Sequence, residues 1–266
     1  MKFLSRIEQK TGDLYADCFK VLDEEQWHFQ GQLLAEQLGI TQRIVLGKVC
    51  LDAGCGHGSL TYQLLQLGAK EVYGVDLKPA PKQGAFDRFG NVSFVQASLL
   101  DLPFENNFFD VVVCTGVLHH TLNPEKGFAE MTRVLKPGGR FVLGVYGKHG
   151  LFPYCLALAR FFTVTLPIVP EKLVSKLAEL LRLNPIWRYQ VLDYLYVPIL
   201  RRYSPAQVKE MFLKYNFDEP VRLPNLTPER AQYFVSHHTS YSYDYTKLKS
   251  KILFGHGFIV VAGTKK

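Results

Sequence analysis

Three glycines and two aspartates in the first third of the chain have the types and spacing of a ligand-binding loop. Gly54, Gly56 and Gly58 alternate with other residues, so the backbone there can turn sharply and lie close to a bound molecule. Asp52 precedes the loop by two residues, and Asp76 follows Asp52 by 24 residues. The pattern predicts a site where main-chain N–H groups and carboxylates face the same ligand.

The loop differs from the dinucleotide fingerprint G-x-G-x-x-G, because Ser59 stands where the third glycine would fall. A carboxylate at Asp52 would repel a pyrophosphate but would suit a ligand that carries an ammonium group. This argues against NAD and favours a cofactor with an amino-acid moiety. Asp76 can accept both hydroxyls of a ribose, although an aspartate at this position can also cap the following helix.

Two adjacent histidines, His119 and His120, follow a strongly apolar segment that ends at Thr115. Histidine titrates near neutral pH, so either side chain could act as a general base. Each could instead cap the turn or hold the loop, and the sequence leaves these roles open. No group of histidine, cysteine and acidic residues has metal-ligand spacing, so we expect no metal site.

The elements that must position these residues follow from the apolar pattern. Strands are expected at 48–52, 71–76, 92–96, 109–115 and 140–146, and helices at 24–38, 59–67 and 125–135, with a turn at 136–139. Alternating strands and helices predict a parallel sheet with helices on both faces. The aspartates and the histidine pair then lie at the carboxyl ends of strands, where ligands bind in open α/β sheets.

This alternation stops at Gly147, and residues 147–204 are mainly helical in pattern and rich in aromatic side chains. Ser204 and Pro205 begin a new helix, and two closing strands are expected at 221–223 and 258–263. We therefore predict an α/β fold: a Rossmann-like, seven-stranded, mostly parallel sheet with helices on both faces and a helical insertion after the fifth strand. The expected parts are an N-terminal helical segment (1–44), a core (45–146), a helical cap (147–204) and a C-terminal part of the core (205–266).

Five segments, in this order, resemble the class I S-adenosylmethionine (SAM)-dependent methyltransferases of the UbiE-like (methyltransferase type 11) subgroup. They lie at residues 52–58, 75–77, 98–104, 109–120 and 133–139. The resemblance covers residues 45–146 strongly and 205–263 weakly. It implies that SAM is the cofactor and that the reaction is in-line methyl transfer, in which the enzyme aligns the reactants and excludes water.

The resemblance also implies which residues hold the cofactor. They are Asp52, Gly54, Cys55, Gly56, Gly58, Asp76, Leu77, Ser98, Leu99 and Thr115. Many relatives carry an aspartate where Ser98 stands, and that aspartate accepts a hydrogen bond from the adenine N6 amino group. Serine can accept the same bond more weakly, so Ser98→Asp is expected to keep or improve SAM affinity. His119 and His120 are the candidate catalytic residues.

Composition leaves the partners open. The chain has 266 residues and a net charge of +7, which permits contact with nucleic acid or an anionic membrane. The basic residues are scattered, however, and we interpret them as solvated surface. Five cysteines without a C-x-x-C pair are typical of a reduced, cytoplasmic protein. The apolar stretch 151–170, with Arg160, Lys172 and Lys176, also suits peripheral contact with a membrane.

We expect methylation of a small, fairly apolar metabolite, because the cap is rich in large apolar side chains that could enclose one. An RNA or protein methyltransferase is an alternative suggested by the charge. Against it, residues 115–120 lack the Asn/Asp-Pro-Pro-aromatic motif of enzymes that methylate nucleic-acid amino groups. A non-catalytic SAM-binding partner is a third interpretation, suggested by Ser98 alone. The sequence does not identify the acceptor.

Overall fold

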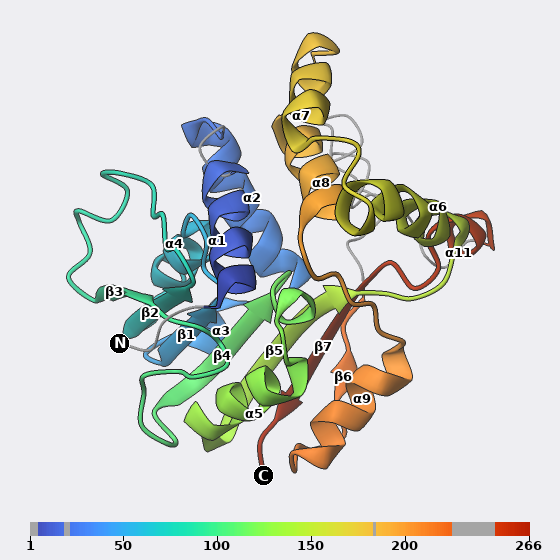
Figure 1. The fold of residues 1–266 in the computed structure, drawn as a ribbon. Coiled ribbons are helices and arrows are strands. Elements are labelled where there is room, and N and C mark those ends of the chain that lie inside the picture. The colour runs from blue at the N-terminus through green and yellow to red at the C-terminus, as the bar shows by residue number, and fades with distance from the viewer. Residues whose placement is uncertain (1–4, 19–21, 183–184, 225–247) are drawn as a thin grey trace.

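A seven-stranded sheet forms the centre of the computed structural model, which describes residues 5–18, 22–182, 185–224 and 248–266 (Figure 1). The strand order is β3-β2-β1-β4-β5-β7-β6. β1 to β5 are parallel, and β7 runs antiparallel between β5 and β6. The mostly parallel sheet expected from the sequence is confirmed. The strands are β1 (Val49–Ala53), β2 (Glu71–Asp76), β3 (Val92–Gln96), β4 (Phe109–Thr115), β5 (Leu135–Tyr146), β6 (Val221–Arg222) and β7 (Phe258–Thr264).

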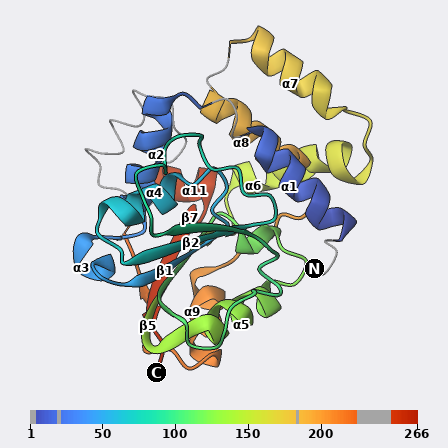
Figure 2. The ribbon, with the colours of Figure 1, turned by 90° about the vertical axis from the view of Figure 1, so that its left-hand side faces the viewer.

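Helices cover both faces of this sheet, as Figure 2 shows. On one face, Leu38 and Leu64 pack against Cys50 and Val72. On the other, the aromatic rings of α5 and α9 pack against β5. Helices on both faces are the second feature of the predicted fold that is confirmed. The helices of these two layers are α2 (Glu24–Gln37), α3 (Gln42–Val45) and α4 (Ser59–Gln66) on the first face, and α5 (Pro124–Val134) and α9 (Pro205–Lys214) on the second.

The order of the strands decides where a ligand can bind. After β1 the chain builds β2 and β3 to one side, and then returns to place β4 and β5 on the other side of β1. Connections that leave β1 and β4 in opposite directions open a crevice at the carboxyl ends of these two strands. The glycine loop follows β1, and the histidine pair forms the 3₁₀ helix η2 (Leu118–His120) just after β4. Both motifs therefore border the same crevice.

The helical insertion after the fifth strand is present and lies above the carboxyl edge of the sheet in Figure 1. Its last helix packs against the N-terminal helix α1 (Arg6–Cys18), because Leu14 forms a small apolar cluster with Tyr196 and Val197. The insertion comprises α6 (Leu151–Arg160), the π-helix η3 (Phe161–Thr165), α7 (Glu171–Leu180) and α8 (Pro185–Tyr196). Prolines in this segment divide it into short helices, as expected.

Three local features differ from the expectations. β5 begins at Leu135 rather than at Arg140. Residues 136–139, expected as a turn, form an irregularity inside this strand, since Leu135 pairs with Phe109 and Arg140 pairs with Val111. The N–H of Gly138 donates to the carbonyl of Lys265, which attaches this irregularity to the end of β7. β6 has two residues rather than three, and the short helix α11 (Leu248–Phe254) had no sequence signal.

Candidate functional site

The glycine loop between β1 and α4 has the backbone conformation that its sequence predicts. Gly54, Gly56 and Gly58 have φ angles of 94°, 50° and 81°, a region that residues with a side chain rarely adopt. A Cβ at Gly54 would also lie 2.1 Å from the side chain of Val117. Position 54 therefore requires glycine for two independent reasons, its dihedral angles and the close approach of the loop after β4.

Asp52 is buried at the end of β1, 2% exposed, and its Oδ2 accepts a hydrogen bond of 2.6 Å from the Thr61 hydroxyl. The pKa of this carboxyl is raised to about 7, because burial and, to a smaller extent, the charge of nearby Asp76 outweigh the lowering effect of the Thr61 hydrogen bond. A cation is the partner that would favour the ionised form. Asp52 is thus suited to hold the ammonium group of an amino-acid moiety.

Asp76, the last residue of β2, is oriented by the backbone on both sides. Its Oδ2 accepts from the Gly56 N–H and its Oδ1 from the Lys78 N–H, each at 3.0 Å. Burial raises the pKa of Asp76, against the lowering effect of these hydrogen bonds. The carboxylate therefore reaches the cavity with its position fixed and with lone pairs left for two further donors, such as ribose hydroxyls.

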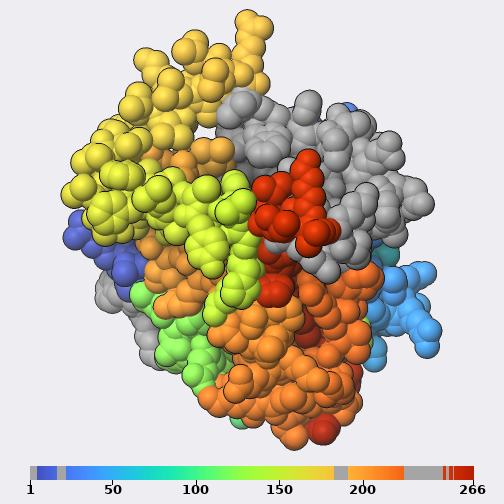
Figure 3. Space-filling view, turned by 90° about the vertical axis from the view of Figure 1, so that its right-hand side faces the viewer, coloured from blue at the N-terminus to red at the C-terminus, as the bar shows by residue number. Residues whose placement is uncertain are grey.

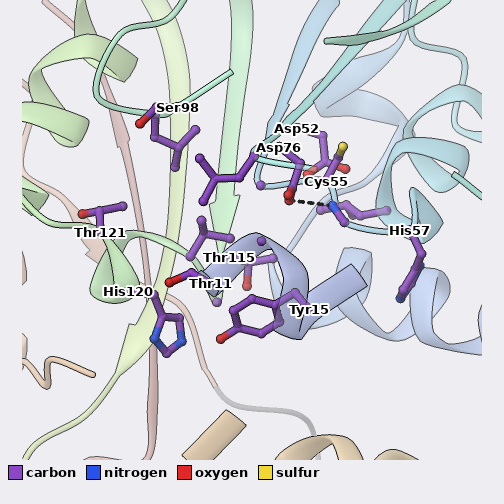
Figure 4. A pocket seen from close by; sticks show the side chains of 18 of the residues that line it. Thr11, Tyr15, Asp52, Cys55, His57, Asp76, Ser98, Thr115, His120 and Thr121 are labelled. Carbon is purple, nitrogen blue, oxygen red and sulfur yellow. Dashed lines mark hydrogen bonds between the residues drawn. The ribbon is translucent and has the colours of Figure 1, made fainter. Parts of the chain in front are cut away.

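A cavity at the carboxyl edge of the sheet brings most of the expected residues together. Asp52, Cys55 and Asp76 gather on one side of it, and Tyr15 and His120 lie on another (Figure 4). It contains about 1290 Å³ of space between atoms, including its open mouth. Ten expected residues line it: Asp52, Gly54, Cys55, Gly56, Asp76, Leu77, Ser98, Leu99, Thr115 and His120. Gly58 and His119 are not among the residues that line it.

Ser98 meets a residue that the sequence did not indicate. Its hydroxyl donates to Glu8 Oε1 of α1 at 2.5 Å, and Ser98 Oγ accepts from the Leu100 N–H. Burial alone would raise the pKa of Glu8, but the hydrogen bonds from Ser98 and Ser5 outweigh it and hold that pKa below its ordinary value. A carboxylate therefore lies beside Ser98, supplied by a helix 90 residues away in the sequence.

Helix α1 forms a wall of the cavity through Ile7, Glu8, Thr11, Gly12 and Tyr15. Besides the Ser98 contact, it is held by an ion pair of 2.7 Å between Asp13 and Lys78. Two aromatic residues that precede the core differ in their surroundings. Trp27 packs in the interior, since it is 1% exposed and donates to the His57 carbonyl, whereas Tyr15 faces the cavity.

The two histidines have different surroundings. His119 is fully buried, and neither of its ring nitrogens has a hydrogen-bond partner in the described parts of the chain. Burial holds the pKa of His119 well below its ordinary value, so the ring is neutral. His120 lines the cavity, and its Nδ1 lies 2.7 Å from the Ile199 carbonyl. Only His120 is therefore placed where it could act on a bound acceptor.

Cap residues 147–204 were expected to hold the acceptor. Among the described residues of the cap, none lines the cavity; the wall nearest to the cap is formed by Tyr15, His120 and Tyr146. The cap contacts these three side chains through Asp193, a residue that the sequence did not single out. The burial of Asp193 could not be inferred from the sequence, because a single aspartate in an apolar helix does not reveal which distant side chains will pack against it.

Comparisons with known proteins find similarity to methyltransferases. Residues 51–143 match the family model described as "Methyltransferase domain". Sterol 4-C-methyltransferase strm-1 of Caenorhabditis elegans is 34% identical over 154 residues, which cover 50% of this chain and 46% of that protein. The ubiquinone/menaquinone biosynthesis C-methyltransferase UbiE of Yersinia pestis bv. Antiqua (strain Antiqua) is 32% identical over 153 residues, covering 52% of this chain and 61% of that protein. The chain thus spans about half the length of these curated relatives.

Phosphoethanolamine N-methyltransferase 2 of Haemonchus contortus, solved in complex with SAM, has the same fold with a TM-score of 0.58 at 19% identity. The superposition covers 98% of this chain and 60% of that one. That neighbour binds SAM, the cofactor that the resemblance implied for this chain. Residues 51–143 therefore match a methyltransferase domain, and about half of the chain is similar to C-methyltransferases, UbiE among them.

Proposed function

We propose that the protein transfers the methyl group of SAM to a small, fairly apolar acceptor. The observation that carries this proposal is a cavity that joins the carboxylates of Asp52 and Asp76 to Tyr15, His120 and Tyr146. In this proposal Asp52 pairs with the ammonium group of the cofactor and Asp76 accepts its ribose hydroxyls. The acceptor then lies between the cofactor and the aromatic side chains.

The chemistry asks little of the protein beyond alignment. SAM supplies an activated methyl group on a positively charged sulfur. The protein contributes orientation, which can be worth about 7–11 kcal/mol, and the exclusion of water by apolar walls. Apolar side chains from four parts of the chain serve this purpose: Ile7, Val117, Leu122 and Phe258. Removal of a proton is required only if the acceptor carries one on the methylated atom.

The names of the curated relatives support a small-molecule acceptor. One is a sterol 4-C-methyltransferase and the other a C-methyltransferase of ubiquinone/menaquinone biosynthesis. We therefore infer an acceptor of similar apolar character for this chain. RNA and protein acceptors are the alternative that the charge suggested, and the experiment below distinguishes them.

A screen with isotopically labelled SAM tests the proposal. The full chain is incubated with a metabolite extract, with total RNA and with a protein fraction, and the labelled product is identified by mass spectrometry. We expect label in an apolar metabolite. Label in RNA or protein alone would support the alternative, and SAM binding without label in any fraction would support a non-catalytic partner. Asp76→Ala is the matched negative control, because it removes the ribose contact.

Exposed apolar side chains on the cap support a second element of the proposal, peripheral contact with a membrane. Of the 18 large apolar side chains that are exposed in the described residues, 12 lie between 151 and 181. The cap stands out from the body in Figure 3. On α7, Leu173, Leu177 and Leu180 form an outward stripe, whereas Ala178 is buried. No helix in the described residues is long and apolar enough to span a bilayer.

We propose that this face rests on a lipid surface, with Lys172, Lys176 and Arg182 beside the lipid headgroups. A cytoplasmic enzyme docked in this way would meet an acceptor dissolved in the bilayer. Flotation with vesicles of phosphatidylcholine and phosphatidylglycerol tests this, and Leu173→Ser/Leu177→Ser should reduce the floated fraction. The control is Leu213→Ser, an equally exposed leucine on α9. A wild-type chain that stays at the bottom of the gradient would show that the face does not bind lipid.

A further inference from the structure

Four polar side chains from four separate elements meet at the end of the cavity nearest to the cap. They are Tyr15 of α1, His120 of η2, Tyr146 of β5 and Asp193 of α8. Asp193 is fully buried, and it accepts hydrogen bonds from the hydroxyl of Tyr15 at Oδ1 and from that of Tyr146 at Oδ2, the latter at 2.6 Å. Tyr15, His120 and Tyr146 also line the cavity.

Of the two ring nitrogens of His120, only Nδ1 has a hydrogen-bond partner among the described residues. The Ile199 carbonyl can only accept, so Nδ1, 2.7 Å away, carries the hydrogen and donates it. Nε2 then presents its lone pair to Asp193 Oδ1 at 3.4 Å, without a hydrogen bond to any described residue. A buried polar atom in this state requires an explanation. A proton placed on Nε2 would convert the contact into a charge-assisted hydrogen bond to the carboxylate.

We propose that Tyr15, Asp193 and His120 form a proton relay that ends on His120 Nε2, with Tyr146 holding the second oxygen of Asp193, and that the acceptor carries a hydrogen on the atom that is methylated. Such acceptors include phenols, enols and carbon acids activated by a carbonyl group. The inference rests on the proposed methyltransferase function and specifies its substrate class. It assigns Tyr15 as the catalytic residue that touches the acceptor, and Asp193 as the group that connects Tyr15 to the imidazole.

The acceptor's bond to hydrogen breaks, and its electron pair forms the new bond to the methyl carbon while the carbon–sulfur bond breaks toward sulfur. The proton passes to the Tyr15 oxygen as the Tyr15 proton moves to Asp193, and the proton on Asp193 then passes to His120 Nε2. Tyr15 and Asp193 end unchanged, and His120 ends as an imidazolium paired with the carboxylate.

Burial and the neighbouring charged groups together keep the His120 ring neutral, so that it can accept a proton. The guanidinium of Arg160 donates to the Tyr194 and Val197 carbonyls, and it lies near Asp193 without an ion pair to it in the described structure. Burial lowers the pKa of His120, Asp193 raises it, and Arg160 lowers it again, with a net lowering. His119 is neutral, and its ring lies 4.0 Å from that of His120. His120 therefore starts the reaction without a proton on Nε2.

Nuclear magnetic resonance of the full chain tests the relay without an acceptor. Imidazole nitrogens are labelled with ¹⁵N, S-adenosylhomocysteine is bound, and His120 is assigned from the signal lost in His120→Asn. We expect a bare Nε2 at pH 8, and a pKa that falls by about 1 unit or more in Asp193→Asn, because an adjacent negative charge is removed. A protonated Nε2 at pH 8 in the wild type, or an unchanged titration in Asp193→Asn, overturns the proposal.

Turnover gives the second measurement once the screen has supplied an acceptor. Tyr15→Phe should lower kcat by about 10²–10⁴-fold, with SAM affinity retained. The control is Tyr196→Phe, which also removes one phenolic hydrogen bond in the cap, to the Val169 carbonyl, but does not touch the relay. Full turnover in Tyr15→Phe overturns the proposal. If the chain binds SAM but methylates nothing, the proposed function is contradicted and not the relay. The titration of the His120 imidazole then still tests the relay.

Discussion

Cofactor affinity should depend on pH through Asp52, the buried carboxyl beside the glycine loop. Burial is the main reason that its pKa is raised to about 7. An adjacent cation lowers the pKa of a carboxyl by about 1–3 units, so a fall of about 2 units on binding corresponds to about 2.7 kcal/mol. Above pH 7 the carboxylate is already ionised and this energy is available. Below pH 7 binding must first displace a proton, so affinity falls as the pH falls.

The expected size of this effect is about a tenfold weaker affinity at pH 6 than at pH 8, with about half a proton released per cofactor bound at pH 7. Isothermal titration calorimetry with S-adenosylhomocysteine, which keeps the ammonium group, measures both quantities. The same titration in two buffers with different ionisation enthalpies gives the number of protons released.

Asp52→Asn should lose most of the pH dependence and keep the fold, since Thr61 can still donate to the amide oxygen. Asp110→Asn is the control, because Asp110 lies at the start of β4, away from the cavity, and pairs with Lys136 at 2.8 Å. It should keep the wild-type slope. A wild-type affinity that is flat from pH 6 to pH 8, or a full slope in Asp52→Asn, would refute the assignment of Asp52 to the ammonium group.

Two further substitutions test the packing around the site. A Cβ at Gly31 would lie 2.4 Å from the Ser59 carbonyl oxygen, so Gly31→Ala should cost about 1–3 kcal/mol in thermal unfolding, whereas Gly90→Ala, with no atom within 4 Å, should cost less than about 0.5 kcal/mol. Ser98→Asp should weaken SAM binding, because it brings a second carboxylate against Glu8, and the added substitution Glu8→Gln should restore it. Equal or better affinity in Ser98→Asp alone would contradict the role of Glu8.

At position 98 the tertiary structure reverses what the sequence alone leads one to expect of an aspartate. From the sequence, an aspartate at position 98 would give a stronger acceptor for the cofactor. In the structure that place is already next to the Glu8 carboxylate, which accepts the Ser98 hydroxyl. Two carboxylates at this distance repel each other, so the same substitution is expected to loosen α1 rather than to strengthen binding.

The sequence by itself determined the sheet, the glycine loop and the two aspartates beside it. These features are local: an apolar strand of five to seven residues, a turn that requires glycine, and a carboxylate at the last position of a strand each follow from neighbours in the chain. The parallel arrangement then followed from the alternation of strands and helices. For the same reason, most of the expected cofactor residues reach one cavity.

Only the tertiary structure decided which distant side chains complete the site. Glu8 meets Ser98 across 90 residues, and Tyr15 meets Asp193 across 178. In the sequence these are ordinary polar positions on helices, and nothing in their spacing distinguishes them from solvated ones. They become functional candidates because α1 and α8 pack together over the carboxyl edge of the sheet. That packing buries a carboxylate, which then needs hydrogen-bond donors that only the folded chain can supply.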